Sequence, residues 1–115
     1  MEPTIRERIQ KYQDEIYSGN LNPDRLSEML LEITALLGNI GDYITECDMA
    51  YNRVLSDFYA TEDTANRAKI KADISEEYKL MKQAKTIEKV AIGMERAIKY
   101  RLRVMQSEMQ AGGAF

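Results

Sequence analysis

Apolar residues recur along most of the chain at the spacing of an α-helix. Between residues 26 and 58 they stand alternately four and three positions apart without interruption, which places them on one face of a long helix. We therefore predict a helix over about residues 23–59 that carries the seam of a coiled coil or an elongated bundle. The seam positions are Leu26, Leu30, Ile33, Leu37, Ile40, Ile44, Cys47, Tyr51, Val54 and Phe58.

A second set of apolar residues widens this face. Met29, Leu36, Tyr43 and Ala50 follow each other at intervals of seven and lie beside the seam. A two-stranded coil needs only the narrow seam, so the wider face indicates at least three packed helices.

A shorter helix is predicted before the long one, over about residues 3–17. Its apolar stripe consists of Ile5, Ile9, Tyr12 and Ile16. Gly19 can take the left-handed conformation that ends a helix. Asn22 can cap the next helix, and Pro23 fits its first turn.

A third helix is predicted over about residues 64–109, after a turn in which Thr61 or Thr64 can act as the cap. Residues 111–115 are expected to form a flexible tail. The apolar stripe of this third helix is Ile70, Ile74, Tyr78, Met81, Ala84, Ile87, Ala91, Met94, Ile98, Leu102, Met105 and Met109.

The predicted fold is all-α: an elongated helical hairpin or coiled-coil bundle of two long helices plus a short N-terminal helix. Residues 1–110 are expected to form a single helical domain. The first helix is too short to cover the half near the turn, which leaves an apolar face there, and we expect a dimer or tetramer to bury it. The predicted oligomer interface is Leu37, Ile40, Ile44, Tyr51, Val54 and Phe58.

The composition argues against catalysis. The chain has no histidine and one cysteine, Cys47, so neither a Ser/His/Asp set nor a zinc site can be assembled. Cys47 occupies a seam position and is expected to be a small buried hydrophobe. We predict a protein that is not an enzyme and needs no cofactor. With no signal peptide and no long apolar run, a cytoplasmic protein without membrane contact is expected.

Charge is divided unevenly along the chain. Residues 1–65 hold five basic and thirteen acidic residues, whereas residues 66–115 hold eleven basic and six acidic ones. Six cations of the third helix share one face, which is typical of a surface that follows a phosphate backbone. These predicted nucleic-acid- or anion-binding residues are Lys82, Lys85, Lys89, Arg96, Lys99 and Arg103.

Tyr78 and Tyr100 can supply stacking surfaces beside these cations. The alternative interpretation is structural, because a basic helix can pair with an acidic one along the flank of a bundle. The acidic partners would then come from the second helix, with Asp42, Glu46, Asp48 and Asp57.

The last half of the chain resembles small all-helical accessory proteins of bacteriophages and prophages. The resemblance lies in Asn66-Arg67-Ala68-Lys69-Ile70-Lys71-Ala72, in Ser75-Glu76-Glu77-Tyr78 and in Lys99-Tyr100-Arg101-Leu102-Arg103. It implies a factor for phage recombination or replication, or a small inhibitor of host defences, acting in the host cytoplasm.

The functional prediction is a homo-oligomeric helical adaptor that binds nucleic acid, or a complex handling nucleic acid, through the basic third helix. Two alternatives remain open at this point. One is an inhibitor that binds a host protein through apolar residues near the turn, with Tyr51, Phe58 and Tyr59 as the contact surface. The other is an oligomeric sponge for small nucleotide signals.

Overall fold

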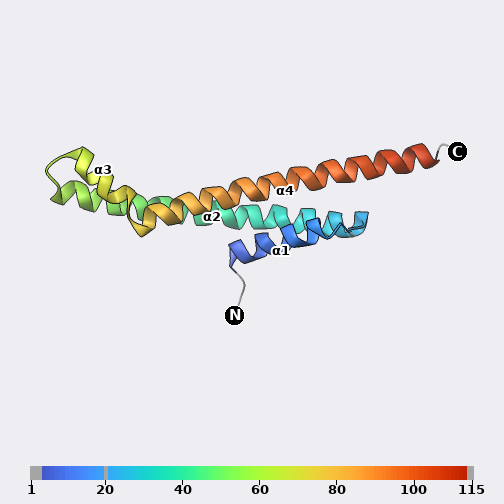
Figure 1. The fold of residues 1–115 in the computed structure, drawn as a ribbon, viewed down its shortest axis with the longest axis horizontal. Helices are drawn as coiled ribbons and strands as arrows, with labels where there is room; N and C mark the ends of the chain where they lie inside the picture. Colours follow the sequence, from blue (N-terminus) through green and yellow to red (C-terminus); the bar gives the residue numbers. More distant parts are fainter. Residues whose placement is uncertain (1–3, 20, 114–115) are drawn as a thin grey trace. The chain divides into compact units, whose positions relative to one another are not determined.

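The computed structural model describes residues 4–19 and 21–113, with side chains up to residue 109. Within these residues the chain forms four helices and no strand (Figure 1). They are α1 (Ile5–Tyr17), α2 (Pro23–Thr61), α3 (Ala65–Asp73) and α4 (Glu76–Gly113). The long helices α2 and α4 pack together, so the predicted all-α fold built on two long helices and a short N-terminal helix is confirmed.

The chain forms two compact units. The first unit consists of Met1–Gly38 and Lys89–Phe115, and the second consists of Asn39–Glu88. The first unit therefore contains α1, the beginning of α2 and most of α4, whereas the second contains the rest of α2, α3 and the beginning of α4. The prediction of a single domain over residues 1–110 stays a prediction.

Local capping explains where α1 ends and where α2 and α3 begin. Gly19 has a φ of 74°, the left-handed conformation that favours glycine after a helix. The side chain of Asn22 accepts a hydrogen bond from the backbone N–H of Arg25 at 2.8 Å. Thr64 accepts one from the N–H of Arg67 at 3.2 Å. The predicted glycine terminus and both predicted caps are confirmed.

The apolar face of α2 is buried or half-buried, in agreement with the heptad pattern, because none of the ten seam positions is exposed. In the first unit the most buried line, however, runs through Leu26, Met29, Ile33 and Leu36. Met29 and Leu36 were expected to flank the seam, yet they lie at its centre. The reason is that α2 packs against both α1 and α4 in this unit, so that the buried face is wider than that of a two-helix coil.

The prediction of one continuous third helix is wrong, because this part of the chain is broken into α3 and α4 at Ile74 and Ser75. Ser75 caps α4: its hydroxyl accepts a hydrogen bond from the N–H of Tyr78 at 3.2 Å and donates one to the carbonyl of Ala72 at 2.5 Å. Glu76 and Glu77 occupy the first turn of α4, where acidic residues complement the helix dipole.

The break changes which residues are buried. The predicted stripe is confirmed from Tyr78 to Met105, whereas Ile70 and Ile74 are 56% and 81% exposed. In α3 the buried residues are instead Ala68 and Ala72, because the break shifts the helical phase relative to α4. Met109 is exposed as well.

The end of α4 also differs from the prediction. This helix continues through Gly113, three residues into the segment expected to be a flexible tail. Residues 114 and 115 lie outside the described residues.

Candidate functional site

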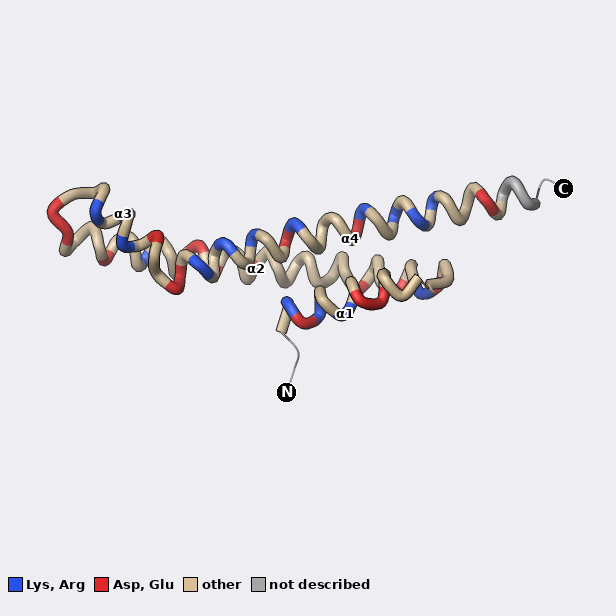
Figure 2. The backbone as a smooth tube through the Cα atoms, viewed as in Figure 1, with Lys and Arg blue, Asp and Glu red and all other residues tan. Residues whose placement is uncertain are grey.

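The six cations predicted from the sequence all lie on α4 and are all exposed. We call Lys82, Lys85, Lys89, Arg96, Lys99 and Arg103 the basic face of α4. Lys82 and Lys85 belong to the second unit, and the other four belong to the first. Figure 2 shows basic positions on both parts of this helix, with none between residues 90 and 95.

Three members of the basic face interact with neighbouring side chains. The Nζ of Lys82 lies 5.5 Å from the centre of the Tyr78 ring, a cation–π distance. The Nζ of Lys85 lies 3.7 Å from Oδ1 of Asp48. The Nζ of Lys99 donates a hydrogen bond to Oε1 of Glu95 at 3.2 Å, within the same helix.

The other three members, Lys89, Arg96 and Arg103, have no carboxylate within 4.0 Å among the side chains described up to residue 109. Of the acidic partners that the structural alternative names on α2, Asp48 pairs with this face. Asp42, Glu46 and Asp57 make no ion pair with a described cation. Flanking ion pairs therefore account for a small part of the basic face.

The two tyrosines predicted to stack on bases differ in their surroundings. Tyr78 is half-buried and packs against Tyr51, with the ring centres 5.5 Å apart. The Tyr78 ring therefore already contacts Tyr51 and Lys82 inside the second unit. Tyr100 is 68% exposed and stands one helical turn from both Arg96 and Arg103. Only Tyr100 of the pair therefore offers a free aromatic surface beside the cations of the first unit.

Glu95 forms one hydrogen bond with Lys99 on its own helix and one with Thr34 on α2, both in the first unit. It accepts a hydrogen bond from Lys99 and another from the Thr34 hydroxyl at 3.1 Å. These two hydrogen bonds lower the pKa of the Glu95 carboxyl below its ordinary value of 4.5. Glu95 is therefore ionised at neutral pH and offsets the charge of Lys99.

Gly93 lies within the continuous α4 on the same face, between Lys89 and Arg96. A Cβ atom built at this position would meet no atom of another helix within 4 Å. Packing inside the chain therefore does not require glycine there, although glycine costs about 1 kcal/mol relative to alanine in a helix. The bare backbone lets a partner approach the helix closely at this point.

A second charged cluster joins α1 to α2 around Arg25. Nε and Nη2 of Arg25 donate hydrogen bonds to the two carboxylate oxygens of Glu15 at 2.5 and 2.7 Å. Nη1 of Arg25 reaches Glu28 at 3.2 Å and Glu32 at 3.5 Å. Tyr12 donates a hydrogen bond to Glu32 at 2.9 Å. The bidentate pair of Arg25 with Glu15 and the hydrogen bond from Tyr12 to Glu32 each join α1 to α2, so the cluster holds the two helices together.

In the second unit, the Tyr51 hydroxyl donates a short hydrogen bond to Oδ1 of Asp73, near the end of α3. This bond, together with burial and the charge of Asp73, raises the pKa of Tyr51 from 10.0 to about 12. A phenol that donates to a carboxylate holds its proton more tightly. The pair ties α3 to α2 and is structural in character.

The predicted oligomer interface divides into two groups. Ile40 is fully buried within the single chain, and the interface itself stays a prediction. The other five predicted positions keep part of their surface accessible. These are Leu37, Ile44, Tyr51, Val54 and Phe58. Cys47 is buried, as expected for a small hydrophobe.

The sequence did not single out Arg25, Glu95 or Arg101 as members of any site. Arg101 lines a pocket of about 400 Å³ in the first unit, with Leu26 and Ile98 among its other lining residues. Such a pocket combines residues from distant parts of the chain, so helical periodicity contains no signal for it.

Two classes of site are missing from the described part of the chain. It contains no cluster of three or more side chains of the types that bind metal ions. None of its helices combines the length and hydrophobicity that a membrane span requires.

The chain matches no protein-family model, no curated protein and no solved structure, so the resemblance to bacteriophage accessory proteins stays a prediction.

Proposed function

We propose that the chain is a non-enzymatic helical adaptor that binds nucleic acid through the basic face of α4. The observation that carries this proposal is the exposure of Lys89, Arg96 and Arg103 on one face without a described acidic partner. Unpaired cations at helical spacing neutralise successive phosphates and release the counterions bound to them, which drives association.

Two neighbouring features support nucleic acid as the anion. Tyr100 presents an exposed ring among the cations, and aromatic rings stack on the bases of single strands. Gly93 leaves the helix backbone open between Lys89 and Arg96. Because the chain as a whole carries a net charge of −3, binding is expected to be confined to α4 and to weaken steeply with salt.

Fluorescence anisotropy with labelled single- and double-stranded oligonucleotides at low and moderate salt tests this proposal. We expect binding at low salt that is lost as salt increases. The variant Lys89→Gln/Arg96→Gln/Arg103→Gln should weaken binding by at least about tenfold. It should also reduce the dependence of log K on log salt by about 2 to 3, since each phosphate contact contributes roughly 0.7 to 0.9.

The matched control changes three exposed cations outside α4, in the variant Arg6→Gln/Arg53→Gln/Lys69→Gln. It alters the net charge by the same amount and should leave most of the affinity in place. Absence of binding at low salt, or an equal loss in both variants, would overturn the proposal.

We further propose that the chain associates with a second copy of itself through the second unit. Ile70 and Ile74 lie one turn apart and are strongly exposed, which is costly for an isolated chain. Tyr51, Val54 and Phe58 on α2 also remain partly accessible in this unit. Burial of these side chains against a second copy supplies the driving force.

A further inference from the structure

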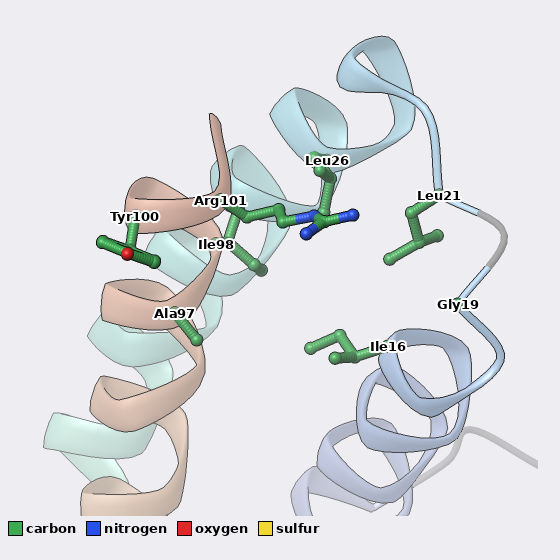
Figure 3. Close-up of a pocket in the computed structure, with 8 residues that line it drawn as sticks. All are labelled: Ile16, Gly19, Leu21, Leu26, Ala97, Ile98, Tyr100 and Arg101. Atoms are coloured by element: carbon green, nitrogen blue, oxygen red, sulfur yellow. The ribbon is translucent and has the colours of Figure 1, made fainter. Parts of the chain in front are cut away.

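A pocket of about 400 Å³ lies in the first unit where the end of α1, the segment after it, the start of α2 and the middle of α4 meet. Figure 3 shows the side chains of Ile16, Leu21, Leu26 and Ile98 around one common space. Leu26 and Ile98 are almost completely buried and form its floor. The volume falls at the lower end of the range of small-molecule sites.

Arg101 is the only charged residue among the described residues that line this pocket. Its side chain extends from α4 toward Leu26, over the apolar space (Figure 3). No described carboxylate lies within 4.0 Å of the Arg101 guanidinium. The pocket therefore combines an apolar interior with one cation that has no counter-charge.

Two further cavities of the first unit lack this combination of an apolar interior and one unpaired cation. The cavity of about 340 Å³ around Arg25 has no aliphatic lining residue, and it contains the carboxylates of Glu15 and Glu32, which pair with Arg25. The cavity of about 300 Å³ between Pro23 and Met109 has no charged lining residue. A ligand with both an apolar body and a negative charge is thus matched by the Arg101 pocket alone among these three.

We propose that the Arg101 pocket binds an apolar carboxylate, with the hydrocarbon part among Ile16, Leu26 and Ile98 and the carboxylate on the Arg101 guanidinium. The planar guanidinium can donate two parallel hydrogen bonds to a carboxylate, an arrangement stronger than a neutral hydrogen bond. Binding also removes from water the hydrocarbon chain of the ligand and the surface that the half-buried Ile16 and Leu21 still expose. This inference is independent of nucleic-acid binding.

Methyl NMR of chain labelled with ¹³C at the isoleucine δ1 and leucine methyl positions tests the proposal, with octanoate as the probe. Ile16 and Ile98 line the pocket, whereas Leu31 is exposed in the first unit outside the pocket lining and reports nonspecific hydrophobic binding. We expect saturable shifts of the Ile16 and Ile98 methyl signals, with those of Leu31 unchanged.

The variant Arg101→Gln should weaken octanoate binding by about tenfold, the loss expected for a charge-assisted pair. The control Arg103→Gln removes an equal charge two residues away, outside the pocket lining, and should bind as the unmodified chain does. Octanol, which has the same chain length and no charge, should bind weakly and to the same extent with and without Arg101. Thermal unfolding of both variants verifies that they are folded.

Several results would overturn the proposal. Equal affinity for octanoate and octanol would remove the role of the carboxylate, and unchanged binding by Arg101→Gln would remove that of Arg101. Equal shifts at Leu31 would mean nonspecific adsorption. Tighter binding of adenosine monophosphate than of octanoate at Ile16 and Ile98 would assign the pocket to nucleotides instead.

Discussion

Arg25 connects two helices of the first unit through one side chain. It binds both carboxylate oxygens of Glu15 on α1 and also reaches Glu28 and Glu32 on its own helix. The hydrogen bonds from Arg25 lower the pKa of Glu15 below its ordinary value of 4.5, and the same pair raises the pKa of Arg25. Glu15 is therefore one residue, with Glu95, through which acid lowers the stability of the fold.

The pH dependence follows from the direction of this change. Since the pKa of Glu15 is lowered in the folded chain, its contribution to the free energy of unfolding is complete above pH 4.5 and disappears as the pH falls through the lowered pKa. We expect Glu15→Gln to be less stable than the unmodified chain by about 1 kcal/mol at pH 7. That difference should shrink toward pH 3.

Urea unfolding at a series of pH values measures this difference. The control Glu46→Gln changes an exposed carboxylate of α2 that makes no ion pair with a described residue, and its stability should follow that of the unmodified chain at every pH. A Glu15→Gln variant whose deficit is the same at pH 3 as at pH 7 would contradict the assignment.

At the scale of single elements, the break between α3 and α4 decides how the second unit packs. Ser75 satisfies a backbone N–H at the start of α4 and a carbonyl at the end of α3. Because of this break, α3 buries Ala68 and Ala72 while Ile70 and Ile74 face outward. The hydrogen bond from Tyr51 to Asp73 then holds α3 on α2.

Ser75→Ala should lower the free energy of unfolding by about 1 kcal/mol, because the first turn of α4 loses its cap. Chemical denaturation followed by circular dichroism measures the change. Ser56→Ala is the matched control, since Ser56 is exposed within α2 and alanine is the better helix former there. Equal stabilities of the two variants would show that Ser75 does not act as a cap.

At the scale of the whole molecule, both long helices contribute to two compact units. In the second unit, exposed isoleucines accompany the partly accessible face of α2. Self-association buries such surface, and it makes the measured stability depend on protein concentration, because the associated state is favoured by mass action.

Light scattering over a range of micromolar concentrations tests self-association. We expect the unmodified chain to form a dimer or a larger assembly, and Ile70→Glu/Ile74→Glu to shift it toward the monomer, because two charges cannot be buried without partners. Leu31→Glu changes an equally exposed apolar residue in the first unit and should associate normally. A stable monomer at all concentrations would exclude this contact.

The sequence alone was sufficient to predict most of the fold. The heptad spacing of α2, the caps at Asn22 and Thr64 and the cations of α4 depend on residues within a few turns of each other, and local periodicity reports such features directly. The break at Ser75 also has a local signal in Ser75-Glu76-Glu77. It was missed because the spacing of Ile70, Ile74 and Tyr78 continues an apolar stripe across it.

The tertiary structure decided which charged side chains have a partner and where the cavities lie. Whether Lys85 or Lys89 has an acidic partner depends on α2 and on how it packs against α4. The pairing of Arg25 with Glu15 and the pocket beneath Arg101 likewise join residues of different helices. The sequence therefore determined the helices and their apolar faces, because these follow from short-range spacing. Pairing and cavities follow from contacts between helices, so only the packed structure establishes them.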